Sequence, residues 1–306
     1  MRILFMGTPD IAAESLNALI AAGHDICAVF TRADKPVGRK QILTAPPVKQ
    51  TAEANGIPVY QPRTLRDGSS DELIKSLAPD IIVVVAYGCI IPPQLLHVAK
   101  YGCINLHVSL LPKYRGSAPI QWAVLNGDAE TGVTIMQLDE GLDTGDMLLK
   151  GVVKISPETT GGELHDALSD LGAALIIEAL RNLNNLKPEA QDDVKSCYAA
   201  KIDKAEAKLD FNLAAEVLER KIRAFNPYPA TYFVYKGERF KVLKAEALDG
   251  NSGRVPGCLI PNDTGLLIEC NPGMLLVTEI QRQGKKAMPT EELLRGFSFD
   301  EEVVLE

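Results

Sequence analysis

The sequence predicts an α/β fold in which a parallel sheet flanked by helices precedes a small β-barrel. Two patterns predict this order. In the first half apolar runs alternate with helical patterns, and in the second half short β-type runs lie close together between Gly, Pro, Asn and Asp. The length of 306 residues is about twice a usual domain of roughly 100–200 residues, which favours two domains.

The first half begins with an apolar run at residues 2–6 and a helical pattern at residues 11–22, which stops at Gly23, a residue that often follows a helix. Several later apolar runs are uninterrupted, as in strands that are buried on both faces of a parallel sheet. In such sheets ligands bind beyond the carboxyl ends of the strands. These further strands are expected at residues 26–30, 57–60, 81–86, 104–107 and 133–138.

A long amphipathic pattern at residues 163–183 closes the first half, and the polar, Pro-containing residues 186–205 are expected to form a linker. The predicted domains are therefore residues 1–185 and 206–306. A helix at residues 213–224 opens the second domain. Its short strands are expected at residues 231–235, 240–245, 258–260, 266–269 and 275–280. Their density is typical of a small barrel, of which the five-stranded OB type is one example.

The composition, with 46% hydrophobic and 24% charged residues, is that of a folded globular protein. The longest apolar run, residues 81–86, is far shorter than the roughly 20 residues that cross a bilayer, and the N-terminus lacks a cleavable hydrophobic segment. We therefore expect a cytoplasmic protein without a membrane partner. The six cysteines form no C-x-x-C pair, which argues against a zinc ribbon and favours small buried side chains.

The net charge of −8 argues against a protein that simply coats nucleic acid. The charge is uneven, because residues 201–290 hold 14 basic and 11 acidic side chains, whereas residues 291–306 hold one basic and six acidic ones. The mildly basic segment is compatible with a polyanionic partner and also with an ordinary surface.

Two polar residues interrupt the strand expected at residues 104–107. In a strand, Asn105 and His107 have the period-two spacing that sends both side chains to the same face. An amide and an imidazole would then meet at the carboxyl end of a strand, where a ligand is expected. A structural role for a single histidine is the alternative.

An acidic loop, Asp139-Glu-Gly-Leu-Asp-Thr-Gly-Asp146, could place Asp143 beside His107 and orient it for acid–base chemistry. The spacing does not meet the calcium-loop pattern, so no metal is predicted, and a solvated turn is the alternative. Near the N-terminus, Gly7-Thr-Pro-Asp10 departs from the dinucleotide fingerprint because Pro9 replaces its second Gly. A dehydrogenase is therefore not expected.

These residues together resemble a known signature. Asn105-x-His107-x-Ser109-Leu-Leu-Pro112, Arg115-Gly116 and Gly141-Leu-Asp-Thr-Gly145 are similar to the motifs of the folate-dependent formyltransferases. Further motifs resemble those of the family members that formylate methionyl-tRNA. They include Asp34-Lys-Pro-x-Gly-Arg39, Val84-Val-Ala-Tyr-Gly88, Ile222-Arg-Ala-Phe-Asn-Pro227 and Gly284-Lys-Lys-Ala-Met288.

The resemblance implies a Rossmann-like formyltransferase domain joined to an OB-like, tRNA-binding domain. It implies an enzyme that transfers the formyl group of 10-formyltetrahydrofolate to the amino group of methionyl initiator tRNA, for translation initiation and without a metal. A monomer is expected. Carried over residue by residue, the catalytic set is Asn105, His107 and Asp143. The folate-binding residues are Ser109, Leu110, Leu111 and Pro112.

Residues 31–46 form a loop too long for a simple strand-to-helix connection. In the family such an insertion contacts the acceptor end of tRNA, which implies RNA contacts for Arg39 and Lys40. An exposed polar loop without a ligand is the alternative. Further candidates for phosphate contact are Lys204, Lys208, Lys285 and Lys286.

Two other functions stay open at this point. A formyltransferase or formyltetrahydrofolate hydrolase with a small-molecule acceptor would use the same Asn105, His107 and Asp143 and differ only on the acceptor side. A noncatalytic RNA-binding module on a nucleotide-binding fold would leave the polar residues at the strand end unexplained.

Overall fold

A computed structural model describes residues 1–38, 40–260, 262, 265–300 and 303–305. The chain forms two compact units. The first comprises residues 1–119, 130–153 and 165–199, and the second comprises residues 120–129, 154–164 and 200–306. Among the described residues, no helix is long and apolar enough to cross a membrane.

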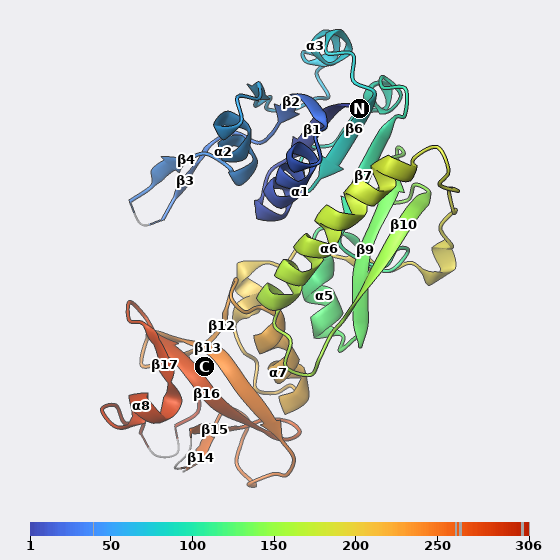
Figure 1. The fold of residues 1–306 in the computed structure, drawn as a ribbon. Coiled ribbons are helices and arrows are strands. Elements are labelled where there is room, and N and C mark those ends of the chain that lie inside the picture. Colours follow the sequence, from blue (N-terminus) through green and yellow to red (C-terminus); the bar gives the residue numbers. More distant parts are fainter. Residues whose placement is uncertain (39, 261, 263–264, 301–302, 306) are drawn as a thin grey trace. The chain divides into compact units, whose positions relative to one another are not determined.

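A seven-stranded sheet forms the centre of the first unit (Figure 1). The order is β10-β9-β7-β6-β1-β2-β5, and the pairings β5–β2, β2–β1, β1–β6 and β6–β7 are parallel. This confirms the expected parallel sheet of a Rossmann-like domain. The strands are β1 (Arg2–Gly7), β2 (Asp25–Phe30), β5 (Val59–Tyr60), β6 (Ile81–Val85), β7 (Cys103–His107), β9 (Glu130–Gln137) and β10 (Met147–Lys154).

The edge of this sheet differs from the expectation. Strand β9 runs antiparallel to β7, with Asn105 opposite Met136 and His107 opposite Thr134. Strand β10 at the outer edge was not expected, because its exposed and half-exposed residues lack a continuous apolar run. An antiparallel edge on a mainly parallel sheet is a common arrangement in α/β proteins.

Helices cover both faces of the sheet. On one face lie α1 (Asp10–Ala21), which buries Ile11, Leu16 and Leu19, and residues 165–182 of α6 (Gly161–Asn182), where Gly172 closely approaches Leu106 of β7 (Figure 1). The opposite face carries an apolar cluster that includes Ile82, Val84 and Cys103. The remaining helices are α2 (Pro47–Ala54), α3 (Asp71–Ser76), α4 (Pro93–Leu96) and α5 (Pro119–Leu125).

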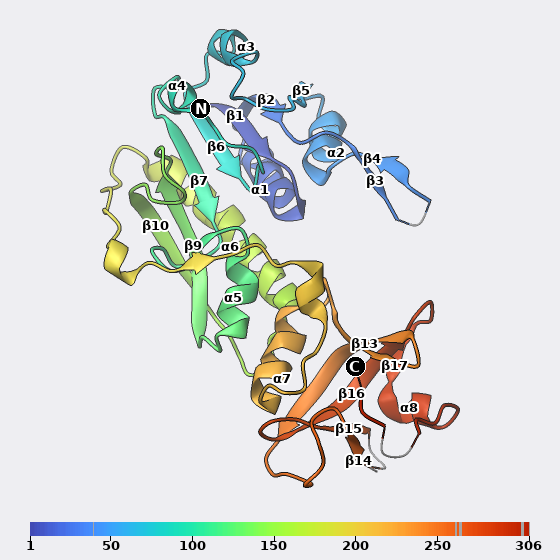
Figure 2. The same cartoon turned by 180° about the vertical axis from the view of Figure 1, so that it is seen from behind.

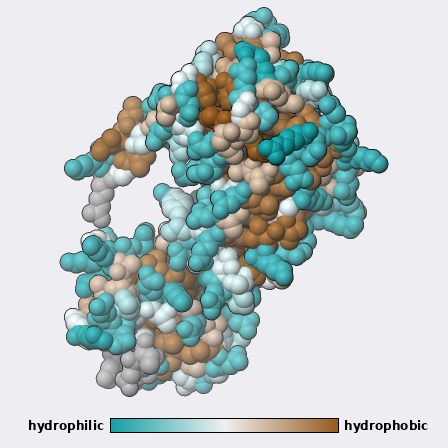
Figure 3. All heavy atoms as spheres, viewed as in Figure 1, coloured by the Kyte–Doolittle hydropathy of each residue, from teal (hydrophilic) through white to brown (hydrophobic). Residues whose placement is uncertain are grey.

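The long loop at residues 31–46 contains a β-hairpin, made of β3 (Lys35–Val37) and β4 (Ile42–Thr44). All residues of the two strands are exposed. The hairpin projects from the sheet as an arm (Figure 1). Three of its side chains, Val37, Ile42 and Leu43, are apolar and 56–67% exposed. Figure 3 shows apolar surface on this arm.

An antiparallel sheet and one amphipathic helix form the core of the second unit (Figure 2). The order β12-β13-β16-β15-β14, with β17 beside β16, is consistent with the expected small barrel domain. The strands are β12 (Thr231–Tyr235), β13 (Glu238–Leu248), β14 (Leu259–Ile260), β15 (Leu266–Glu269), β16 (Met274–Arg282) and β17 (Ala287–Pro289); the helices are α7 (Ala215–Ala224) and α8 (Thr290–Leu294).

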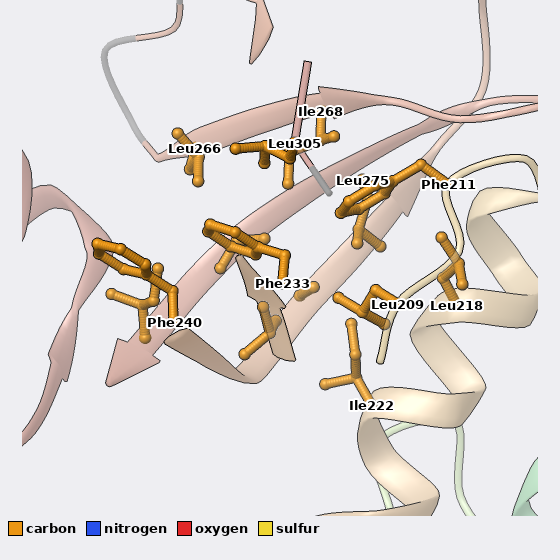
Figure 4. Packing of buried hydrophobic residues seen from close by; sticks show 14 of the residues in the cluster. Leu209, Phe211, Leu218, Ile222, Phe233, Phe240, Leu266, Ile268, Leu275 and Leu305 are labelled. Carbon is orange, nitrogen blue, oxygen red and sulfur yellow. The ribbon is translucent and has the colours of Figure 1, made fainter. Parts of the chain in front are cut away.

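The inward face of this sheet is strongly apolar. Phe233 of β12 and Phe240 of β13 are fully buried, and their rings stack with centroids 5.4 Å apart. Leu218 and Ile222 of α7 pack into the same cluster with Leu275 of β16 (Figure 4). Along β12, and along parts of β13 and β16, these buried side chains alternate with half-exposed or exposed ones, which is the pattern of an antiparallel sheet with one buried face, whereas β15 is buried throughout.

Residues 186–199 of the predicted linker belong to the first unit. Glu189 forms an antiparallel bridge with Met147, and β11 (Tyr198–Ala199) pairs in parallel with β8 (Arg115–Gly116). This segment therefore packs along the loops that follow β7 and β9.

Candidate active site

Strand β7 ends with the two polar side chains predicted from the sequence. Asn105 and His107 are buried, with 9% and 6% of their surface exposed, and Ser109 just beyond the strand is fully buried. Leu106 contacts α6, so its two neighbours along the strand point to the opposite face. The described residues give the Asn105 amide no hydrogen-bond partner, which leaves its N–H donors available to a bound substrate.

An oxygen atom lies near each nitrogen of the His107 imidazole. Nε2 lies 2.8 Å from the carbonyl oxygen of Tyr114, and Nδ1 lies 3.7 Å from Oδ1 of Asp143. Because a carbonyl oxygen only accepts hydrogen bonds, Nε2 carries a proton in this arrangement. The Asp143 side chain is 13% exposed, so the pair lies in a largely water-excluded place.

Asp143 is fixed by the backbone of a second loop. Its Oδ2 accepts a hydrogen bond of 2.8 Å from the N–H of Gly116 in β8. Gly116 has φ of 116°, and a Cβ atom there would lie 2.7 Å from the carbonyl oxygen of Ala199. Only glycine fits this position without a shift of the β8–β11 pair.

Two residues around the histidine have left-handed backbones. Asp143 has φ of 54° and Tyr114 has φ of 61°, and neither is a glycine. Such conformations are uncommon and persist only where the surroundings impose them, often at functional sites. Here Asp143 supplies the carboxylate and Tyr114 the carbonyl group that face His107.

The turn that follows β7 is held by buried hydrogen bonds. The Thr134 hydroxyl of β9 donates to the carbonyl oxygen of Ser109 at 2.7 Å and accepts from the N–H of Leu111 at 3.1 Å. The Ser109 hydroxyl donates to the carbonyl oxygen of Lys113 at 2.6 Å. Residues Ser109, Leu110, Leu111 and Pro112 thus form a rigid rim directly beyond Asn105 and His107.

The predicted RNA contacts are exposed where the structure describes them. Arg39 lies outside the described residues, and Lys40 is exposed in the turn between β3 and β4. The four lysines of the second unit that were predicted to contact phosphates are also exposed. They are Lys204, Lys208, Lys285 and Lys286.

A polar cluster anchors the base of the arm. Lys49 of α2 lies 2.9 Å from Asp34, and Gln61 donates to the same carboxylate at 2.8 Å. The hydrogen bonds from Gln61 and Lys49 lower the pKa of Asp34, and the bond to Asp34 raises the pKa of Lys49. Both charges are stabilised by the pairing.

Three contributors to the site were not predicted from the sequence. They are the carbonyl of Tyr114, the N–H of Gly116 and the side chain of Gln191, which donates to the loop that carries Asp143. Arg115-Gly116 belongs to the motif set and could have signalled the first two. Gln191 carries no such signal, because it lies in the polar segment expected to be a linker. Among the described residues, no group of three His, Cys, Asp or Glu side chains could hold a metal ion.

Comparison with known proteins decides the family. Residues 1–180 match the formyl transferase family, and residues 201–298 match the formyl transferase C-terminal domain. The chain belongs to the formyltransferase family. The resemblance predicted from the motifs is confirmed, and the chain is an enzyme of this family.

Three relatives are named methionyl-tRNA formyltransferase. The protein of Rhizorhabdus wittichii is 48% identical over 98% of this chain and 96% of its own length. Those of Thiobacillus denitrificans and Marinobacter nauticus are 47% and 46% identical, each over 97% of this chain and 96% of its own length. Relatives of this kind do not favour the small-acceptor alternative.

Solved structures show the same fold at low identity. An N-formyltransferase of Helicobacter canadensis, in complex with folinic acid and dTDP-3-aminofucose, aligns with a TM-score of 0.68 at 20% identity, over 92% of this chain and 99% of its own. A 4-N formyltransferase of Francisella tularensis aligns with a TM-score of 0.61 at 18% identity, over 78% of this chain and 94% of its own.

Proposed function

We propose that this enzyme transfers the formyl group of 10-formyltetrahydrofolate to the amino group of methionyl initiator tRNA, for translation initiation. The observation that carries the chemistry is the meeting of Asn105, His107 and Asp143 at the carboxyl end of β7, with one ion-pair distance of 3.7 Å between the last two. The near full-length similarity to methionyl-tRNA formyltransferases supports the acceptor.

The reaction forms one C–N bond and breaks another. The neutral methionyl amine attacks the formyl carbon, and the carbonyl oxygen becomes an oxyanion. The Asn105 amide, whose donors have no partner among the described residues, stabilises this charge by hydrogen bonding. The bond between the formyl carbon and the folate nitrogen then breaks, and formyl-methionine remains on the RNA.

The amine loses one proton in the transfer, and the departing folate nitrogen gains one. We assign assistance in this proton exchange to His107, and the Tyr114 carbonyl and the Asp143 carboxylate beside its ring support this assignment. Asp143 does not need to contact substrate for this role. It holds the imidazole in one orientation and offsets its positive charge when a second proton is bound.

The rim at Ser109, Leu110, Leu111 and Pro112 is the proposed folate contact. Its backbone is fixed by the fully buried Thr134, so a bound folate meets a preformed surface. Such a surface lowers the entropic cost of positioning the donor next to the attacking amine.

The proposed RNA contacts lie on the β3–β4 arm and on the second unit. Arg39 and Lys40 in the arm, and Lys204, Lys208, Lys285 and Lys286 in the second unit, would neutralise phosphates. Lys204 stands 5.8 Å from the ring centroid of Tyr228, which is 64% exposed. An exposed ring beside a cation suits stacking against a nucleobase.

We propose that the enzyme acts in the cytoplasm, because its proposed acceptor is a tRNA that enters translation, and that it is a monomer, as expected from the resemblance. From the sequence we also propose residues 1–185 as the formyltransferase domain and residues 206–306 as the tRNA-binding domain.

A panel of acceptors tests the proposal. Formyl transfer from 10-formyltetrahydrofolate is measured with charged initiator methionyl-tRNA, glycinamide ribonucleotide, a formyl-accepting amino sugar, or water alone. We expect turnover only with the tRNA. Turnover with a small acceptor, or release of free formate as the main product, would contradict the proposed acceptor. Neither result would change the catalytic roles assigned to Asn105, His107 and Asp143.

A further inference from the structure

We infer that Gln191 is a positioning residue that holds the loop carrying Asp143 in its active conformation. The inference rests on the proposed function, since the conformation matters only if Asp143 serves His107 in formyl transfer. Gln191 touches no reacting atom in this account. It acts through the backbone of the catalytic loop.

The Gln191 amide ties the loop at two points. Its Nε2 atom donates to the carbonyl oxygen of Asp143 at 2.7 Å and to that of Gly145 at 2.8 Å. One NH2 group thus uses both of its hydrogens on backbone acceptors of the same loop. Gln191 is half-buried, so water competes poorly for these acceptors.

A second side chain orients the amide. The Nε atom of Arg115 donates to Oε1 of Gln191 at 3.0 Å, and its terminal nitrogen pairs with Asp193 at 2.7 Å. A guanidinium only donates, so the amide oxygen must face Arg115 and the amide nitrogen must face the loop. The Arg115 side chain is 13% exposed, which keeps this orientation fixed.

The loop needs such support because its backbone is unfavourable at the catalytic residue. Asp143 adopts a left-handed φ of 54°. Within the loop, the Thr144 hydroxyl donates to the Asp139 carboxylate, and this contact is exposed to solvent. Gln191 holds the carbonyl side of Asp143, while Gly116 holds its carboxylate. The two contacts together fix the direction of the carboxylate toward His107.

The test uses three variants of the full-length enzyme. Gln191→Met keeps the length of the side chain and removes every hydrogen bond. Gln191→Glu keeps the acceptor for Arg115 but replaces the donors to the loop with an oxygen that repels both carbonyls. Val194→Ala is the matched control, because Val194 lies on the same segment with 94% of its surface exposed.

We expect kcat for methionyl-tRNA formylation to fall about 10- to 100-fold in Gln191→Met and further in Gln191→Glu, because a small displacement of a catalytic group costs about that much. The KM values for folate and for tRNA are expected to change less than about 2-fold. Val194→Ala is expected to match the wild type. Wild-type kcat in both Gln191 variants would overturn the inference, and so would an effect confined to KM.

A double-mutant cycle separates positioning from a general structural role. If Gln191 acts through Asp143, the double variant Gln191→Met/Asp143→Asn has nearly the same kcat as the single variant Asp143→Asn. Multiplicative losses in the cycle would contradict the inference. Melting temperatures show whether any variant is unfolded at the assay temperature. If Gln191→Met is unfolded, the cycle is measured with Gln191→Glu instead.

The proposed function is checked separately by the wild-type enzyme in the same assay. If the wild type turns over with another acceptor only, the cycle is run with that acceptor. A failure of the proposed acceptor is then distinct from a failure of the role of Gln191.

Discussion

The carboxylate of Asp143 stands between two partners: one oxygen lies 3.7 Å from Nδ1 of His107, and the other accepts the N–H of Gly116 at 2.8 Å. The histidine therefore rests against a carboxylate that cannot rotate freely, and it is held on its other side by the Tyr114 carbonyl. In a buried place such an arrangement aligns the imidazole before substrate arrives. Preorganisation of this kind is a main source of catalytic rate.

Gly116→Ala is expected to lower activity through Asp143. The added Cβ would meet the Ala199 carbonyl oxygen at 2.7 Å on a backbone with φ of 116°, so β8 must shift and the N–H moves away from the carboxylate. We expect kcat to fall about 10-fold or more and stability to fall by about 1–3 kcal/mol. Steady-state kinetics and urea unfolding measure both effects.

Gly237→Ala is the matched control for that prediction. Gly237 also has positive φ, at 78°, but a Cβ there meets no atom within 4 Å. We expect a stability loss of about 1 kcal/mol and unchanged kcat. Equal losses of kcat in the two alanine variants would show that the Gly116 contact has no catalytic role.

Much of this fold could be predicted from apolar patterns. Strands β1, β2, β6, β7 and β12 lie where continuous or alternating apolar residues placed them, because burial on one or both faces leaves a clear periodicity. Strand β10 and the β3–β4 hairpin could not be predicted in this way. The residues of β3 and β4 are exposed and most of those of β10 are half-exposed or exposed, so these strands are held by pairing of backbone groups, which leaves no trace in composition.

The candidate site shows the same division. Asn105 and His107 were accessible to sequence reasoning, because two polar side chains at period two in a buried strand need an explanation. Asp143 followed from an acidic, glycine-containing motif. Gln191 did not, since the hydrogen bonds that bring it to the loop depend on how residues 186–199 pack.

The Asp34 cluster predicts a pH dependence of stability. Hydrogen bonds from Gln61 and Lys49 hold the pKa of Asp34 below its ordinary value of 3.8. A lowered folded-state pKa gives stability that is complete above pH 3.8 and is lost as the pH falls through the lowered value. Asp34→Asn should therefore be less stable than wild type at pH 7, and the difference should shrink below pH 3.8.

Urea unfolding between pH 7 and pH 3 measures this difference, with Asp249→Asn as an exposed aspartate control. A gap between wild type and Asp34→Asn that stays constant to the lowest pH would argue against a paired carboxylate at the base of the arm.

Lys40→Gln and Lys204→Gln are expected to weaken tRNA binding without changing the chemical step. Each removes one exposed positive charge that the proposal sets against a phosphate. The slope of log affinity against log salt should fall by about 1 in each variant, with kcat unchanged. Lys150→Gln, an exposed lysine of β10, serves as control. If the slope in all three variants equals that of the wild type, Lys40 and Lys204 do not contact the RNA.

Thiol labelling is expected to separate the cysteines by burial. Burial raises the pKa of Cys103 and of Cys270 to about 12, whereas Cys197 is exposed. Iodoacetamide at pH 8 should therefore modify Cys197 before the other two, as followed by mass spectrometry.

Labelling at Cys197 should also reduce turnover. Its Sγ atom accepts a hydrogen bond of 3.2 Å from the N–H of Tyr114, whose carbonyl faces His107. The Cys197→Ser variant should resist this inactivation. Modification of Cys103 at the rate of Cys197 would contradict the packing of β7.

Single-turnover formyl transfer to methionyl-tRNA can be compared between wild type, Asn105→Ala, His107→Gln and Asp143→Asn, with folate affinity measured in parallel. We expect each substitution to slow the transfer at least 100-fold while folate binding changes only slightly, because Asn105 and His107 serve the chemical step and Asp143 orients His107, and none of these roles lies in binding the donor. Wild-type transfer rates in these variants, or losses explained by weaker folate binding alone, would contradict these roles.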